Sequence, residues 1–129
     1  MKTQKQLLGN LGEDLAVKFL EKQGYKIIER NLKTGRVGEI DIIARKNGEL
    51  IFIEVKTKSN YETGLPEEEF NFHKKKKMQR AVQSYLWKNN LQNESIRVDL
   101  IAIDVLKQLS PDQKQEVKIR HYPDMPIFE

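Results

Sequence analysis

Two apolar-rich segments joined by Asn47-Gly48 constrain the fold of this 129-residue chain more than any other feature of its sequence. Asn-Gly between two runs of β-forming residues is the strongest short-range signal for a two-residue hairpin turn. The runs span residues 39–45 and 50–57, so we expect antiparallel strands in which the numbers of paired residues sum to 95, as 47 and 48 do. A slip of one residue would turn every side chain to the other face, so the pattern specifies the register.

In that register the two faces of the hairpin differ in chemistry. One face is wholly apolar and is expected to lie in the core; it carries Ile40, Ile42, Ala44, Ile51, Ile53 and Val55. Because side chains alternate along a strand, the other face is expected to set Asp41 opposite Glu54 and Glu39 opposite Lys56. Two carboxylates about 5 Å apart repel each other by about 3 kcal/mol at an effective dielectric near 20. The facing acids therefore need an explanation.

Two interpretations of the acidic pair remain open from the residues alone. A divalent cation could lie between the acids, since Mg²⁺ accepts one or two carboxylates together with water and phosphate oxygens. Such a cation polarises a phosphodiester, and Lys56 on the same face could stabilise the charge that grows on the phosphate. Alternatively, the face is simply solvated and stabilised by cross-strand pairs with Lys56 and Arg45, which is common for surface hairpins.

The rest of the chain predicts helices on either side of a sheet. Apolar spacing predicts a helix over 5–23 that ends at Gly24, and a second helix over 72–89 with Asn71 as its cap. Further strands are expected at 25–30, 97–105 and 115–121. The order is α-β-β-β-α-β, which predicts a mixed α/β sheet covered by helices. We expect one domain over 1–129, with its core at about 5–105 and a C-terminal extension over 106–129.

Composition narrows the functional class. The chain has no cysteine, which excludes disulfides and thiolate metal sites, and no apolar run approaches the roughly 18 residues of a membrane span. It also lacks the apolar core of a signal peptide, so a cytoplasmic protein without membrane partners is expected. His73 and His121 lack zinc-ligand spacing and are expected to be incidental. Asp99 is expected to make a structural hydrogen bond, either near Arg97 or to a helix end.

The second helix begins with a run of lysines, residues 74–77, in a chain whose formal net charge is only +4. Positive charge at the start of a helix opposes the helix dipole, so the run makes better sense beside phosphates. An ordinary solvated helix turn is the alternative. The aromatic residues of this helix, Phe72, Tyr85 and Trp87, are expected in the core.

The hairpin residues carry a resemblance to a known family. The segment Gly38-Glu39-Ile40-Asp41, followed by Glu54-Val55-Lys56, resembles the Asp…Glu-X-Lys signature of the PD-(D/E)XK nuclease superfamily. More closely, residues from about 9 to 105 are similar to the bacterial YraN-like proteins, predicted endonucleases that are distant relatives of archaeal Holliday junction resolvases. The resemblance implies a restriction-endonuclease-like fold and cleavage of DNA, including branched or junction DNA. The expected partner is DNA, with branched or single-stranded regions as candidate substrates.

The resemblance also implies roles for individual residues. Asp41, Glu54 and Lys56 would be catalytic, with Glu13 as a further acid. Asp41 and Glu54 would bind Mg²⁺, for which Mn²⁺ substitutes, and Glu39 is either an additional metal ligand or a salt-bridge partner of Lys56. The residues expected along the DNA backbone are Lys74, Lys75, Lys58 and Arg45.

The sequence leaves open the class of function and the oligomeric state. A different class of function is a non-catalytic module that recognises branched or damaged DNA, in which the carboxylates have only a structural role. The complete set of two acids and a lysine favours the enzyme, since pure binding would do better without negative charge facing phosphates. Symmetric cleavage of a junction would require a homodimer.

Overall fold

A computed structural model describes residues 1–59, 64–106 and 116–127. The elements, in chain order, are α1 (Gln4–Lys22), β1 (Lys26–Lys33), β2 (Glu39–Lys46), β3 (Glu49–Ser59), the short 3-10 helix η1 (Pro66–Glu69), α2 (Phe72–Lys88), β4 (Ile96–Val105) and β5 (Val117–Tyr122). The predicted α-β-β-β-α-β order is confirmed, and β5 adds the expected last strand. Residue 115, where that strand was predicted to begin, lies outside the described residues.

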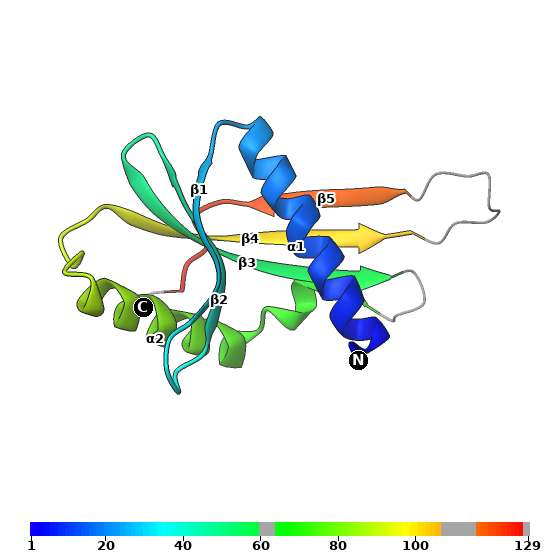
Figure 1. The fold of residues 1–129 in the computed structure, drawn as a ribbon, viewed down its shortest axis with the longest axis horizontal. Coiled ribbons are helices and arrows are strands. Elements are labelled where there is room, and N and C mark those ends of the chain that lie inside the picture. The colour runs from blue at the N-terminus through cyan, green and yellow to red at the C-terminus, as the bar shows by residue number, and fades with distance from the viewer. Residues whose placement is uncertain (60–63, 107–115, 128–129) are drawn as a thin grey trace.

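The five strands form one mixed sheet in the order β1-β2-β3-β4-β5. Strands β3 and β4 are parallel and the other neighbours are antiparallel, so η1 and α2 form the crossover between the two central strands. Figure 1 shows α1 crossing in front of β3, β4 and β5. Neither α1 nor α2 is long and apolar enough to cross a membrane.

Local signals in the sequence set the helix ends. Thr3 and Gln6 form a capping box at the start of α1, and Gly24 follows its end with φ 89°. A left-handed glycine at this place closes a helix without the steric cost that other residues incur. The Asn71 side chain accepts a hydrogen bond of 3.1 Å from the backbone N–H of Lys74, which confirms Asn71 as the cap of α2.

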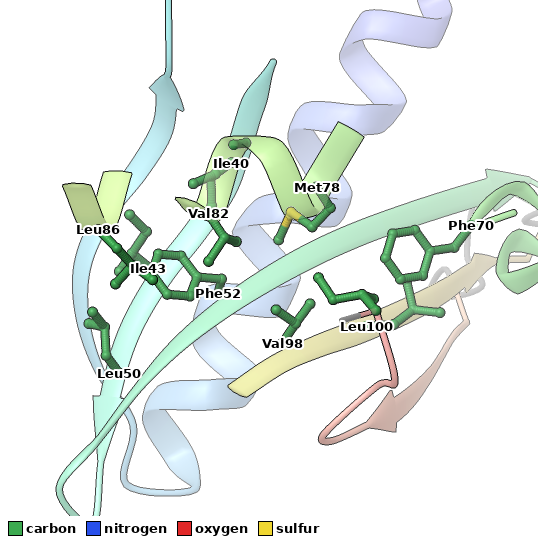
Figure 2. Packing of buried hydrophobic residues seen from close by; sticks show 12 residues of the cluster. Ile40, Ile43, Leu50, Phe52, Phe70, Met78, Val82, Leu86, Val98 and Leu100 are labelled. Carbon is green, nitrogen blue, oxygen red and sulfur yellow. The ribbon is translucent and has the colours of Figure 1, made fainter. Parts of the chain in front are cut away.

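Both faces of the sheet are buried, each beneath one helix. The face under α1 packs Ala16 and Leu20 against strand residues that include Ile42, Ile53 and Ile101. The opposite face lies under α2, where Met78 and Val82 pack beside Ile40 and Phe52 (Figure 2). The face of the hairpin that the sequence predicted to be charged is therefore apolar in its middle, because Ile43, Leu50 and Phe52 of the same face are buried under α2.

The predicted register of the hairpin is confirmed over five pairs, from Lys46–Glu49 to Ile42–Ile53. Pairing with β2 stops there, whereas β3 stays paired with β4 as far as Ser59–Val105. Strand β2 thus leaves β3 at Asp41, where β1 is distorted as well, since Asn31 lies between the Arg30–Ile42 and Leu32–Ile40 pairs with φ 52°.

This departure corrects one prediction about the hairpin faces. Ile40 was expected beside Ile42 on a single apolar face, but it packs with Ile43 in the cluster under α2. The alternation of faces is broken at Asp41, where Asn31 of the neighbouring β1 has a positive φ, so Ile40 and Ile43 face the same helix. Glu39 likewise is not paired opposite Lys56.

The prediction that the aromatic residues of α2 lie in the core was wrong for two of the three. Phe72 is 72% exposed and Trp87 is 73% exposed, whereas the Tyr85 ring lies 5.5 Å from the Phe52 ring. The apolar stripe that faces the sheet is Met78, Ala81, Val82 and Leu86. Phe72 and Trp87 lie outside this stripe, so packing against the sheet does not account for them.

Candidate functional site

Asp41 lies where β2 leaves β3, and its carboxylate is held against the backbone of β3. Oδ2 of Asp41 accepts a hydrogen bond of 2.8 Å from the backbone N–H of Val55. Because Val55 lies between Glu54 and Lys56, this bond fixes the carboxylate close to both of those side chains. The end of the hairpin ladder thus places an acid from β2 next to an acid and a lysine from β3.

Glu54 is the second acid of this site, and its surroundings disfavour its charge. Burial, then the charge of Asp41, and then a hydrogen bond between the two carboxyl groups raise the pKa of Glu54 well above its usual value. Lys56 and Lys74 act in the opposite direction. The Nζ atom of Lys56 lies 3.7 Å from Oε1 of Glu54, so one ammonium group offsets only part of the repulsion between two acids.

Glu13 reaches the same place from α1. Its Oε1 atom is buried and has no hydrogen-bond partner, although Asn31 hydrogen-bonds to this carboxyl group. Burial, followed by the charge of Asp41, raises the pKa of Glu13 to about 7. A buried carboxylate oxygen without a partner costs stability, which is unusual in a folded protein unless a ligand supplies the missing contact.

A close contact between α1 and β3 puts Glu13 in this position. A Cβ atom on Gly12 would lie 1.8 Å from Oγ1 of Thr57, so only glycine allows the helix to approach the strand this closely. The sequence did not predict that Gly12 and Thr57 position Glu13. The signal that could have predicted this contact is a glycine next to an acid in the middle of an amphipathic helix.

Asp41, Glu54 and Lys56, at the end of the hairpin, line two adjoining hollows. The hollow toward α2 has a volume of about 250 Å³ and is also lined by Glu39, Lys74 and Lys77. The hollow toward α1 has a volume of about 200 Å³ and also includes Glu13, Lys5 and Glu69. Both include Asp41, Glu54 and Lys56, and we call the two hollows together the acidic pocket. It is an open groove between the helices in which Asp41, Glu54 and Lys56 are shared by both hollows, and further lysines and acids lie around them.

The donor set of the acidic pocket fits a hard divalent cation with few protein ligands. Asp41 and Glu54 supply two carboxylates whose mutual repulsion a cation would relieve, and Mg²⁺ usually takes one or two carboxylates and completes its shell with water and phosphate oxygens. Among the described residues, no three acidic, histidine or cysteine side chains are grouped closely enough to hold one ion. Glu39 is exposed and lines the rim of the pocket, so it does not join the other two as a third ligand here.

The basic residues predicted to contact DNA divide into two groups. Lys74 lines the acidic pocket together with Lys77, which the sequence interpretation had not selected from the lysine run. The spacing of these two lysines, three residues apart and just before the buried Met78, is the signal that could have identified Lys77. Lys75 instead lines a different hollow, on the other side of the same helical turn.

The other two predicted DNA contacts do not line the acidic pocket. Nζ of Lys58 lies 3.7 Å from Oε1 of Glu69, beside the hollow toward α1. Arg45 binds Glu94 at 2.6 Å, next to the turn of the hairpin and at the opposite end of β2 from Asp41. The structure therefore places Lys74 at the acidic pocket but does not bring Arg45 to it.

A second polar cluster lies on the same sheet, around the fully buried Asp99. Arg97 donates to both oxygens of Asp99, at 2.9 and 3.1 Å, and the backbone N–H of Asp124 donates to it at 3.0 Å. Nε2 of His121 lies 2.7 Å from Oδ2. The expected structural bond between Asp99 and Arg97 is confirmed, and His121 has a partner although the sequence predicted it to be incidental.

Comparisons with known proteins place the chain among bacterial relatives without an assigned activity. A family model described as "Uncharacterised protein family UPF0102" matches residues 12–103. The UPF0102 protein TTE1452 of Caldanaerobacter subterraneus is 37% identical over 120 residues, which cover 93% of this chain and 94% of that protein. The UPF0102 protein CD630_12710 of Clostridioides difficile is 44% identical over 100 residues, which cover 78% of this chain and 87% of that protein.

The matched region contains every residue of the acidic pocket discussed above except Lys5. A further relative, the UPF0102 protein of Persephonella marina, is 42% identical over 95 residues, which cover 74% of this chain and 81% of that protein. The family model spans most of the chain, and the relatives match over most of their own length. The chain therefore belongs to the UPF0102 family.

Proposed function

We propose that the protein is a metal-dependent endonuclease that hydrolyses phosphodiester bonds in DNA, with Mg²⁺ as its cofactor and Mn²⁺ as a substitute. The observation that carries the proposal is the meeting of Asp41, Glu54 and Lys56 in one open pocket, where the two half-buried acids lie against each other. A resemblance to the PD-(D/E)XK nucleases in the same residues supports it.

Each residue of the pocket has a definable task in such a reaction. Asp41 and Glu54 would hold the cation, which when bound polarises the phosphate and lowers the pKa of a water molecule. Lys56 lies beside Glu54 with its ammonium group in the pocket, where it can donate to a phosphate oxygen and stabilise the charge that develops during hydrolysis. Glu13 is close enough to Asp41 for their charges to interact and can orient a water molecule from the α1 side.

The margin of the pocket suits a nucleic-acid backbone. Lys74 and Lys77 line it from the first two turns of α2, and Lys5 lines it from α1. Contacts between lysines and phosphates provide affinity without sequence specificity. The acids at the centre favour an enzyme over a simple binding module, because negative charge would weaken the binding of DNA unless a cation lies between them.

The test is a cleavage assay on linear, single-stranded, flapped and four-way-junction DNA with Mg²⁺, with Mn²⁺ and with chelator. We expect the parent protein to cleave at least one of these substrates only when a divalent cation is present. Asp41→Asn and Glu54→Gln should reduce the rate by about 10³-fold or more, and Lys56→Ala by about 10²-fold or more. Glu21→Gln, which changes an exposed acid on α1, is the matched control and should keep the parent rate.

Two outcomes would contradict the proposal. One is equal cleavage by the parent and all three variants, which would indicate a contaminating nuclease. The other is tight DNA binding without cleavage of any substrate, which would instead support the non-catalytic module for branched or damaged DNA. If a junction is cut symmetrically, sedimentation of the complex should show a homodimer, because each chain supplies one acidic pocket.

A further inference from the structure

An exposed aromatic side chain lies at the start of α2, on the side away from the acidic pocket. Phe72 is 72% exposed and borders a hollow that it lines together with Lys75, Lys76, Pro126 and Ile127. Ile127 belongs to the core, so the hollow has an apolar base and a basic rim. Nζ of Lys76 lies 5.5 Å from the centre of the Phe72 ring. The ring thus combines an open π surface with a nearby positive charge.

The charge of α2 identifies the kind of partner that this surface fits. The helix carries five lysines and one arginine and no acidic residue, whereas α1 carries three lysines and three acids. A partner for the face around Phe72 must therefore be anionic, and it must also offer a flat apolar surface to the ring. Unpaired nucleotides provide both, since the base stacks on an aromatic side chain while the phosphate meets the lysines.

The position of Phe72 relative to the acidic pocket connects the two surfaces. Lys74 and Lys77 line the acidic pocket, while Lys75 and Lys76 of the same turns line the hollow beside Phe72. A strand whose phosphate lies in the acidic pocket can therefore continue across the first turn of α2 and remain in contact with lysines. Phe72 is the first residue of that helix and lines the same hollow as Lys75 and Lys76, so its ring borders the surface along which the strand would continue.

We propose that Phe72 is a stacking site for an unpaired base, located a short distance along the strand from the phosphate held in the acidic pocket. This inference rests on the proposed function and names its substrate class, DNA with a single-stranded segment beside the cleaved bond. Bases inside a duplex are already stacked and paired, so they cannot lie on the ring without being extruded. Phe72 therefore distinguishes substrates that contain unpaired nucleotides from fully paired DNA.

The first test measures DNA affinity in the presence of a chelator, because removal of the divalent cation prevents cleavage during the measurement. Fluorescence anisotropy is recorded with a single-stranded oligothymidine and with a hairpin duplex of the same charge. Phe72→Ala should weaken binding of the single strand by about 5- to 100-fold and leave duplex binding within about twofold. Trp87→Ala is the matched control, because Trp87 is an equally exposed aromatic residue of α2 that lies about 20 Å along the helix.

The second test reports stacking directly. Trp87 is the only tryptophan of the chain, so the double variant Phe72→Trp, Trp87→Phe moves the fluorophore to the proposed site. Oligothymidine should quench the fluorescence of this variant strongly and the fluorescence of the parent weakly. The double variant Lys75→Gln, Lys76→Gln should lower the slope of log affinity against log salt by about 0.7 for each lost phosphate contact on a single strand.

The results separate the stacking site from the nuclease proposal. Equal losses of single-strand and duplex affinity in Phe72→Ala, or equal losses in Phe72→Ala and Trp87→Ala, would overturn the stacking site. So would unchanged binding of both DNAs by Phe72→Ala, and in each of these cases the metal-dependent cleavage at Asp41 and Glu54 would still stand. A parent protein that binds neither DNA overturns the stacking site, whereas the nuclease proposal is then judged by the cleavage assay with Mg²⁺ or Mn²⁺.

Discussion

The acidic pocket and the Asp99 cluster both bury carboxylates on one sheet, but they treat the negative charge in opposite ways. Asp99 is fully buried, and each of its oxygens accepts hydrogen bonds from Arg97, with further bonds from His121 and the backbone of Asp124. Burial alone would raise the pKa of Asp99, but these bonds outweigh it and lower the pKa below its usual value. In the acidic pocket, the pKa of Glu54 and that of Glu13 are raised.

The difference separates a carboxylate whose partners all come from the protein from carboxylates that lack such partners. Around Asp99 the protein supplies the full set of donors, so the charge contributes to the fold. Around Asp41 and Glu54 it places acid against acid, and it leaves Oε1 of Glu13 buried without a partner. Such an arrangement costs stability in the protein alone, and perturbed carboxyl groups in an open pocket are typical of functional sites.

Removal of the Asp99 side chain should have the largest effect on the stability of the fold. Asp99→Ala removes the buried acceptor that Arg97 and His121 share, although Arg97 keeps Tyr25 and Glu49 as partners, and the loss of one member of a buried ion pair typically costs about 3–5 kcal/mol. We expect a loss of that size in the free energy of unfolding, measured by urea titration at pH 7 in chelator. A loss below about 1 kcal/mol would mean that the two clusters do not differ in the way described.

The contact between α1 and β3 should give the next largest effect. Gly12→Ala places a Cβ on Thr57, so α1 must shift, and overpacking of this kind costs about 1–3 kcal/mol. DNA cleavage should fall as well, because Glu13 moves with the helix. The matched control is Gly9→Ala, whose Cβ would meet no atom within 4 Å and which should stabilise α1 by up to about 1 kcal/mol. If both variants behave alike, Gly12 has no positioning role.

The dependence of stability on pH should report the Asp99 cluster. Because the pKa of Asp99 is lowered by folding, its charge stabilises the protein above the unfolded-state pKa of about 4, and this stabilisation is lost as the pH falls through the folded-state value. One such group contributes a slope of at most about 1.4 kcal/mol per pH unit. The difference in unfolding free energy between the parent and Asp99→Asn should therefore shrink below pH 4. A constant difference between pH 3 and pH 7 would contradict the assignment.

Glu54→Gln should give the smallest effect on stability, with the opposite sign. The substitution removes a buried charge that faces Asp41, and a glutamine amide can still donate to the Asp41 carboxylate. We expect the unfolding free energy to rise by only about 1 kcal/mol in chelator, because the lost ion pair with Lys56 offsets part of the roughly 3 kcal/mol of repulsion from Asp41. A loss of more than 1 kcal/mol in this variant would indicate that Glu54 has a structural role like that of Asp99.

Some of this architecture followed from the sequence and some could not. The Asn47-Gly48 turn and the alternation of apolar residues specified the register as far as Ile42–Ile53, because each slip would have exposed the core. The point at which β2 leaves β3 had no such signature, since it depends on Asn31 of a third strand and on a bond from Asp41 to the backbone. For this reason Ile40 was assigned to the wrong face.

The candidate site was also predicted from the sequence only in part. Asp41, Glu54 and Lys56 are close in sequence to the hairpin turn. The predicted strand pairing therefore placed them together, and they lie together in the structure. The selection of Lys75 over Lys77 depended on the rotation of α2 about its axis, which the contact of Met78 with the sheet determines. The exposure of Phe72 and Trp87 likewise could not be read from apolar content, because the stripe facing the sheet was already complete without them.

The binding of Mn²⁺ tests most directly whether the acidic pocket is a cation site. Free Mn²⁺ gives an electron paramagnetic resonance signal that is lost on binding, so the ion can be titrated into the chelator-treated protein without any DNA. The account predicts saturable binding by the parent and by Glu21→Gln, and binding at least tenfold weaker for Asp41→Asn and Glu54→Gln. Equal affinity in all four proteins, or no saturable binding by the parent at millimolar Mn²⁺, would contradict it.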